Sequence, residues 1–191
     1  KMKKIISKLE NHYIICGYGR MGAVIANELK AKKQKFIIID NDEKKIEILR
    51  ESGMVYLQGD ATSEDTLFKA QIDKASGVAV VLETDQDNLF VTMSIKTLFH
   101  DIFLISRCAR EENQAKLIRA GANKVINPYV SGGHRMAEIL IKPQVEDSIT
   151  VISPKNSKMN LTIDEISLKG VDKYEGITIK DSGIRDKFDI S

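Results

Sequence analysis

The stretch that most constrains the fold is an apolar run that ends in three glycines, His12-Tyr-Ile-Ile-Cys-Gly-Tyr-Gly-Arg-Met-Gly22. The residues before the glycines are strand-like and residues 23–29 have helical composition, so the glycines lie in a strand-to-helix turn. There Gly17 permits a tight bend, Gly19 lets backbone N–H groups approach a pyrophosphate, and Gly22 lets helix and strand pack closely. The N-terminus of the helix would then face the anion. The stretch therefore predicts a phosphate-binding turn.

A second apolar run, residues 36–39, ends on Asp40, eighteen residues after Gly22. An acidic residue near this spacing typically binds the ribose hydroxyls of NAD. Asp60, Asp85 and Arg107 also follow strand-like runs, so the carboxyl edge of a parallel sheet would collect them into one ligand crevice. The alternative interpretation is a simple tight turn, with Asp40 and Asp60 capping helices and Arg107 paired with a carboxylate.

Strand-like and helical segments alternate through the first 128 residues. Strands are expected at 13–16, 36–39, 54–57, 77–82, 102–105 and 125–126, and helices at 23–29, 41–52, just after Ser63, 89–99, 114–120 and 130–141. This alternation predicts an α/β fold with a Rossmann-like, doubly wound parallel sheet of six strands. Val24 and Phe68 are expected among the residues that face the core.

Composition excludes several classes of protein. Of 191 residues, 42% are hydrophobic and 29% charged, which is ordinary for a soluble globular protein. The 29 basic residues nearly balance 27 acidic ones, so nucleic-acid binding is not expected. No apolar run approaches the roughly 18 residues needed to cross a bilayer. Cys16 and Cys108 lack metal-ligand or CxxC spacing and are expected to be buried thiols in a reducing cytosol.

Catalysis is not expected either. A nicotinamide dehydrogenase needs a general acid or base near the reactive ring, often histidine, on a second domain. His12 and His100 fall away from the predicted ligand edge, and only His134 could approach it. The 43 residues after Ser148 are few for a substrate domain. An NAD-dependent oxidoreductase is thus the alternative of another class.

Residues 12–148 resemble the RCK domain, the regulator of potassium conductance, which is also the amino-terminal module of Trk and Ktr potassium-uptake regulators. The similarity is carried by the glycine turn and by four further motifs: Ile39-Asp40, Gly59-Asp-Ala-Thr62, Ile105-Ser-Arg-Cys-Ala-Arg110 and Ala120-Gly-Ala-Asn-Lys-Val-Ile-Asn-Pro128. Together these motifs are far more specific than three glycines.

The resemblance implies a division of the chain. Residues 1–11, a lysine-rich lead-in with apolar residues at roughly helical spacing, would be a linker from a pore helix; a solvated basic arm is the alternative. Residues 12–129 would form the nucleotide-binding lobe, and residues 130–148 the helices between subunits. Residues 149–191 would begin a small α+β carboxyl-terminal subdomain.

The resemblance also implies a function. Domains of this kind dimerise through the helices after the sheet, assemble into an octameric ring, and transmit ligand binding to a membrane pore. We therefore expect a ligand-sensing gating domain of a potassium channel at the cytoplasmic face of the cell membrane, with the pore in the same full-length chain. A free-standing regulatory subunit of a Trk or Ktr uptake system is the alternative.

The resemblance finally suggests the ligand. Arg107 stands where calcium-binding members carry a carboxylate, which favours an anion; Asp40 would repel a 2′-phosphate, so NAD or NADH is expected first and ADP, ATP or AMP second. The expected nucleotide site is Gly17, Tyr18, Gly19, Arg20, Met21, Gly22, Asp40, Asn41, Asp60, Ala61 and Arg107. Ca²⁺ could bind as a separate effector, with Asp85, Asp87 and Glu111 as weak candidate ligands.

Overall fold

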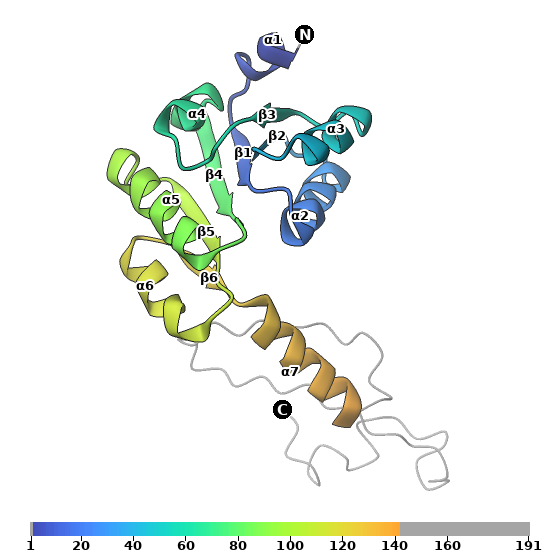
Figure 1. Cartoon of the computed structure of the whole chain (residues 1–191), viewed down its shortest axis with the longest axis vertical. Helices are drawn as coiled ribbons and strands as arrows, with labels where there is room; N and C mark the ends of the chain where they lie inside the picture. Colours follow the sequence, from blue (N-terminus) through green and yellow to red (C-terminus); the bar gives the residue numbers. More distant parts are fainter. Residues whose placement is uncertain (1, 142–191) are drawn as a thin grey trace, which may run out of the picture. The chain divides into compact units, whose positions relative to one another are not determined.

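In the computed structural model, which describes residues 2–141, six parallel strands form one sheet in the order β3-β2-β1-β4-β5-β6 (Figure 1). The strands are β1 (His12–Cys16), β2 (Phe36–Asp40), β3 (Tyr56–Gln58), β4 (Ala75–Val80), β5 (Phe103–Arg107) and β6 (Lys124–Ile126). Strand order reverses beside β1, which pairs with β2 on one side and β4 on the other. The predicted Rossmann-like α/β fold is confirmed.

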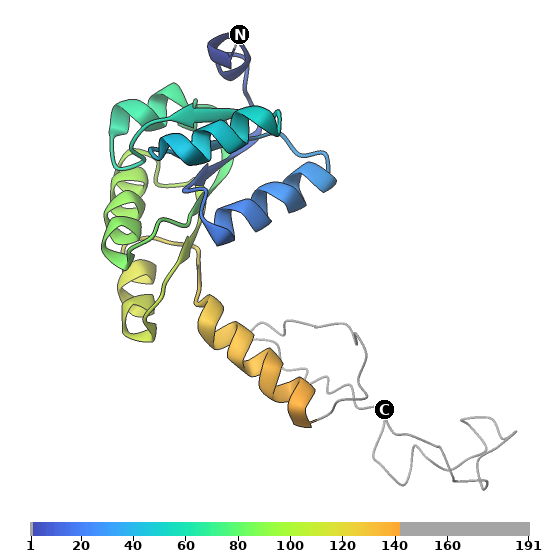
Figure 2. The ribbon, with the colours of Figure 1, turned by 45° about the vertical axis from the view of Figure 1, so that its right-hand side comes forward.

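Helices cover both faces of this sheet (Figure 2). One face carries α2 (Arg20–Ala31) and α3 (Glu43–Glu51); the other carries α4 (Glu64–Lys69), α5 (Asp85–Leu98) and α6 (Gln114–Arg119). All five residues of β2 are buried and the first four are apolar, as expected of a strand covered on both faces; the fifth is Asp40. Short 3-10 turns, Ile72–Lys74 and Glu111–Asn113, precede β4 and α6.

The two faces have separate cores. Beneath α2 and α3, Ile15, Ile38, Ile46 and Leu49 are fully or almost fully buried. The larger core on the opposite face contains nineteen buried apolar residues of the described region, among them Ile14, Ile37, Leu67, Val91, Ile95, Leu104 and Leu117. These buried side chains fix the register of the parallel strands, so the carboxyl ends of β1, β2, β4 and β5 all meet at one edge.

Two inward-facing residues were predicted wrongly. Val24 is 60% exposed and Phe68 is 47% exposed. On α2 the buried positions are Gly22 and Ala26, with Ile25 and Leu29 partly buried, so small residues let the helix lie close to the sheet and turn Val24 outward. Phe68 packs at the surface against Phe99, with ring centroids 5.7 Å apart.

The two ends of the described region are helical. Residues Met2–Ile6 form α1, and Ile6 and Leu9 are buried in the larger core, so the lead-in is amphipathic, as its spacing predicts. After β6, α7 (Pro128–Ile141) begins at a proline, whose missing N–H costs nothing at a first helical position. The chain divides into two compact units, Lys1–Met136 and Ala137–Ser191.

Three predictions on the ends of the chain stay predictions: the linker role of residues 1–11, the intersubunit role of residues 130–148, and the subdomain at residues 149–191. Residues 142–191, which include the whole of that subdomain, lie outside the described residues. Within residues 2–141, none of the helices combines the length and the apolar character needed to span a membrane.

Candidate functional site

A cleft of about 1000 Å³ opens at the carboxyl edge of the sheet, beside the reversal of strand order. Open α/β sheets bind their ligands at this position, and the volume is at the upper end of the range for small-molecule sites. Nine of the eleven residues predicted for the nucleotide line the cleft: Gly17, Gly19, Arg20, Met21, Asp40, Asn41, Asp60, Ala61 and Arg107. Tyr18 and Gly22 do not.

The three glycines of the turn stand in different environments. Gly17 has φ +103°, and a Cβ there would lie 2.9 Å from the carbonyl oxygen of Val81. At Gly22 a Cβ would overlap the carbonyl oxygen of Gly17, so this glycine allows α2 to contact the strand. Gly19 differs from both, since its φ is ordinary and no atom lies within 4 Å of the Cβ position. Neither backbone nor packing therefore demands glycine at position 19, and its missing side chain leaves room in the cleft.

The N-terminus of α2 is prepared for an anion. Gly19 is the N-cap residue and offers no side-chain cap, and the first turn of the helix contains no acidic residue. The helix dipole and the first N–H groups of α2 are therefore not neutralised by a carboxylate of the helix itself. Arg20 is exposed and adds a positive charge at the same end.

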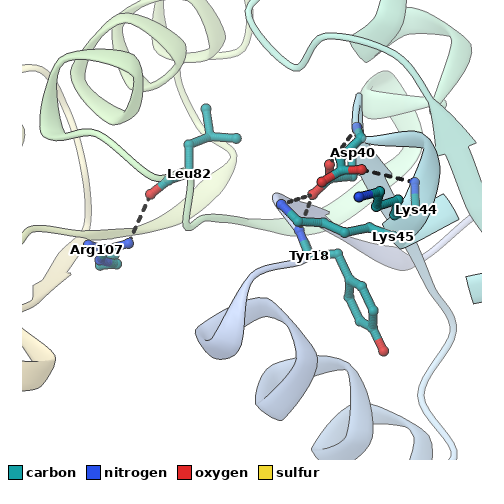
Figure 3. A network of polar contacts seen from close by, with 7 residues as sticks. Tyr18, Asp40, Lys44, Lys45, Leu82 and Arg107 are labelled. Carbon is teal, nitrogen blue, oxygen red and sulfur yellow. Dashed lines mark hydrogen bonds and ion pairs between the residues drawn. The ribbon is translucent and has the colours of Figure 1, made fainter. Parts of the chain in front are cut away.

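Asp40 ends β2 opposite the glycine turn (Figure 3). Its carboxylate accepts hydrogen bonds from the backbone N–H of Tyr18 (2.6 Å) and of Asp42 (2.9 Å), and the Nζ of Lys45 lies 3.3 Å away. The residue is only 6% exposed. Asp40 thus joins the turn after β1 to the start of α3, and Tyr18 belongs to the site through its backbone N–H, although its side chain does not line the cleft.

Arg107 stands apart from the Asp40 group, at the end of β5 (Figure 3). Its Nη1 donates to the carbonyl of Leu82 across 3.1 Å, while its Nε is buried and has no hydrogen-bond partner among the described residues. The buried amide of Asn88 fixes this edge, because it donates to the carbonyls of Leu82 and Arg107 and accepts from the N–H of Leu82. These hydrogen bonds tie the ends of β4 and β5 together, and Arg107 adds a positive charge to the lining of the cleft there.

The acidic candidates for a cation do not come together. Both oxygens of buried Asp85 are already bonded, to the N–H groups of Ala109 and Arg110 and to the Nδ2 of Asn113. Burial raises the pKa of Asp85, but these hydrogen bonds and nearby Arg107 outweigh it, so the pKa is lowered. Asp87 lines the cleft and Glu111 does not. Residues 2–141 contain no group of three acidic, histidine or cysteine side chains placed to hold a metal ion.

Other residues of the cleft escaped the sequence analysis. Lys45, Thr62 and Glu83 line it, as do Pro128 and Tyr129 from the first turn of α7. Lys45 lies five residues after Asp40, in the first turn of α3. Nothing local marks Tyr129, because the fold alone brings the segment after β6 to the edge reached by β1 and β2.

The cysteines and histidines lie elsewhere. Cys16 and Cys108 are free and buried, as predicted, and burial raises the pKa of the Cys16 thiol to about 12. His12 is buried at the start of β1, at the sheet edge opposite the cleft, and its Nε2 lies 2.9 Å from the carbonyl oxygen of Ala70. In the part of the chain that the structure describes, Cys16, Cys108, His12 and His134 all lie outside the lining of the cleft.

Fold and site define a class: a Rossmann-like lobe with a glycine turn, an uncapped helix N-terminus and an acidic residue at the end of the second strand. Residues 13–128, more than half of the chain, match the model of the TrkA-N domain. The chain belongs to the TrkA-N domain family, which confirms the resemblance drawn from its motifs.

Two relatives are informative. Potassium channel protein 1 of Methanocaldococcus jannaschii is 40% identical over 189 residues, covering 98% of this chain and 56% of that protein. The chain thus spans little more than half of this relative's length. Among solved structures, the RCK domain of GsuK is 34% identical, with a TM-score of 0.62 over 72% of this chain and 30% of that one. GsuK has been solved as a channel bound to NAD (34% identity, TM-score 0.63, 70% of this chain and 24% of that one) and bound to ADP (32%, 0.62, 73% and 38%).

Proposed function

We propose that this chain is the ligand-sensing domain of a potassium channel and that its cleft binds a nucleotide, with NAD or NADH favoured over ADP, ATP or AMP. The observation that carries the proposal is Gly19: its Cβ position faces open space at the uncapped N-terminus of α2. Positive helix ends with exposed N–H groups bind phosphates. The fold does not require glycine at position 19. A glycine there is explained if the protein backbone has to approach a bound ligand closely.

The remaining residues have consistent roles. Asp40 would accept hydrogen bonds from the ribose hydroxyls, and Arg20 would meet the phosphates. Arg107 lines the cleft and would add its positive charge to the side of the same ligand nearest β5. These are roles in binding only. The histidines and cysteines that could move a proton lie away from the cleft, which supports a regulatory ligand over the oxidoreductase alternative.

The NAD-bound and ADP-bound states of GsuK support this range of ligands. Both ligands share an adenosine diphosphate group, so both could use Asp40 and the glycine turn. A cation is a separate matter, and Ca²⁺ binding by Asp85, Asp87 or Glu111 stays a prediction.

The coupling we propose is allosteric. The chain would act at the cytoplasmic face of the membrane, dimerise through the helices after the sheet, and assemble into an octameric ring joined to a pore in the same full-length protein. The potassium channel relative and its extra length support a pore in the same full-length protein. A ligand shifts such a ring only by its difference in affinity for the two ring geometries. A free-standing subunit of an uptake system is the second candidate.

The binding proposal is tested by Gly19→Asp, which places a carboxylate where the phosphates would lie. Calorimetry should show NADH affinity reduced at least 100-fold with an unchanged melting temperature. Asn27→Asp is the control, because it adds a carboxylate at an exposed position on the same helix, α2, outside the cleft. Equal NADH affinity in wild type and Gly19→Asp would overturn the proposed site.

The channel proposal is tested on the full-length protein in patches. Nucleotide added to the cytoplasmic side should change potassium current in the wild type and in Asn27→Asp but not in Gly19→Asp. A gene in which no pore-forming segment precedes residue 1 would favour the free-standing subunit.

A further inference from the structure

The cleft extends past the phosphate turn to a residue with no assigned role, Tyr129. Its lining runs from Asp40 and Asn41 after β2 to Pro128 and Tyr129 after β6. In the sheet order, β2 and β6 are separated by β1, β4 and β5. At about 4.8 Å per strand, the two ends of the cleft lie roughly 19 Å apart along the sheet edge.

This span distinguishes the two kinds of ligand. A nucleoside diphosphate whose ribose is held at Asp40 places its phosphates at the glycine turn beside β1 and reaches no farther. A dinucleotide continues with a second ribose and base across β4 and β5, past Arg107. The far half of the cleft is therefore used only by a dinucleotide.

Tyr129 is well placed to meet that second half. It is 59% exposed, although it lies in the first turn of α7 beside the sheet. Its backbone is fixed, since the buried Asn127 accepts hydrogen bonds from the N–H groups of Tyr129 (3.0 Å) and Val130 (3.2 Å). Asn127 in turn donates to the carbonyl of Ala109, in the turn after β5 (3.2 Å).

An aromatic ring on a fixed backbone at the mouth of a cleft is a stacking surface. Planar heterocycles stack on such rings, and truncation of the ring measurably weakens the binding of a stacked base. Because few rotatable bonds are ordered, a tyrosine makes this contact at a low entropic cost.

We propose that Tyr129 contacts the second nucleoside of a bound dinucleotide and thereby selects NAD or NADH over mononucleotides. The inference rests on the proposed nucleotide site. It also means that the ligand touches the first turn of α7 directly, so the helix proposed to join subunits would report which nucleotide is bound.

The test compares NADH with ADP by calorimetry on the full chain carrying Tyr129→Leu or Tyr129→Phe. We expect Tyr129→Leu to weaken NADH binding about tenfold, which corresponds to ~1.4 kcal/mol, and to leave ADP affinity within twofold. Tyr129→Phe keeps the ring and should behave as wild type. Phe90→Leu is the control for loss of an exposed aromatic ring outside the cleft, on α5. Quenching of NADH fluorescence by the ring gives a second readout, expected in wild type and lost in Tyr129→Leu.

The outcomes separate the two proposals. If wild type binds neither nucleotide, the proposed function fails, and this inference fails with it. If wild type binds both and Tyr129→Leu changes neither affinity, or lowers both equally, the nucleotide site stands and the role of Tyr129 is overturned.

Discussion

The backbone N–H of Tyr18 donates a hydrogen bond of 2.6 Å to the carboxylate of Asp40, and so the glycine turn is tied directly to the end of β2. A carboxylate at this position is expected to bind ribose hydroxyls. In this structure Asp40 also stabilises the fold, because its carboxylate accepts hydrogen bonds from two backbone N–H groups and lies beside the ammonium of Lys45. Asp40 therefore orients the turn and the start of α3 before any ligand arrives.

Asp40→Asn should reduce both nucleotide affinity and stability. The amide loses the charge that attracts Lys45 and keeps one acceptor oxygen for two backbone N–H donors. Hydrogen bonds to charged groups contribute about 1.5–3 kcal/mol, so we expect NADH affinity to fall at least tenfold and the free energy of unfolding to fall by about 1–2 kcal/mol. Calorimetry and urea unfolding measure the two effects.

Asp42→Asn is the matched control for that substitution. Asp42 caps α3 by accepting from the N–H of Lys44, and asparagine caps a helix as well as aspartate does. Asp42 also lies outside the cleft lining. A loss of NADH affinity in Asp42→Asn as large as that in Asp40→Asn would mean that general charge near α3, and not Asp40, holds the ligand.

Gly17→Ala should unfold the lobe more readily, whereas Gly19→Ala should not. Gly17 has a positive φ, and an added Cβ would press on the carbonyl of Val81. Left-handed backbone strain alone costs on the order of 1–3 kcal/mol, so we expect at least ~2 kcal/mol lost in urea unfolding. Gly19→Ala serves as the control, because its Cβ enters open space. Equal destabilisation by both substitutions would show that the distinction between the two glycines is wrong.

The sheet could be predicted from the sequence because each strand is marked by residues that are adjacent in the chain. A strand buried on both faces is an unbroken apolar run, as Ile37–Ile39 shows, and each run ends where the turn chemistry of glycine or aspartate begins. The glycine motif and the alternation of strands with helices then leave few topologies open. Nine site residues follow from that topology, since the carboxyl ends of parallel strands meet at one edge.

The features that could not be predicted depend on contacts between segments that are distant in the sequence. Asn88 and Asn127 are buried polar residues whose partners lie 18 or 19 residues away in the sequence, at Arg107 and Ala109. The sequence offered Asp85 as a weak candidate cation ligand but could not show that its oxygens accept hydrogen bonds from the turn after β5. Val24 and Phe68 were placed inward by helical periodicity, which cannot show how closely small residues such as Ala26 let a helix approach its sheet.

Arg107→Glu should weaken nucleotide binding at least tenfold by reversing the charge on the β5 side of the cleft. The change also removes the hydrogen bond to Leu82 and brings a carboxylate near the lining residue Asp87. We therefore expect the variant to gain affinity for Ca²⁺ in the same titration series. The measurements are calorimetric titrations with NADH and with calcium chloride.

Arg110→Glu is the control for Arg107→Glu. Arg110 lies three residues away in the same segment, is exposed, pairs with Glu112, and does not line the cleft. It should leave NADH affinity within twofold. If Arg107→Glu leaves both NADH and calcium binding unchanged, the anion specificity of the site must come from other residues.

Buried His12 should make the domain less stable in mild acid. Burial lowers its pKa below the ordinary value of 6.5, although the bond to Ala70 and the charge of Asp73 oppose this effect. The unfolded chain takes up a proton near pH 6.5 while the folded chain resists it. Above pH 6.5 both forms are neutral and stability is complete, and the free energy of unfolding should fall as pH drops below 6.5, until the folded-state pKa is reached. The slope for one proton is at most about 1.4 kcal/mol per pH unit.

His12→Gln isolates this contribution, because glutamine keeps an N–H donor for the carbonyl of Ala70 but does not titrate. Urea unfolding between pH 7 and pH 5 should show a shallower decline in His12→Gln than in wild type. The control is His100→Gln, which removes an imidazole that is 92% exposed and should leave the wild-type slope in place. Identical slopes in wild type and His12→Gln would assign the acid sensitivity to other groups, because a buried neutral imidazole must cost free energy when it is charged.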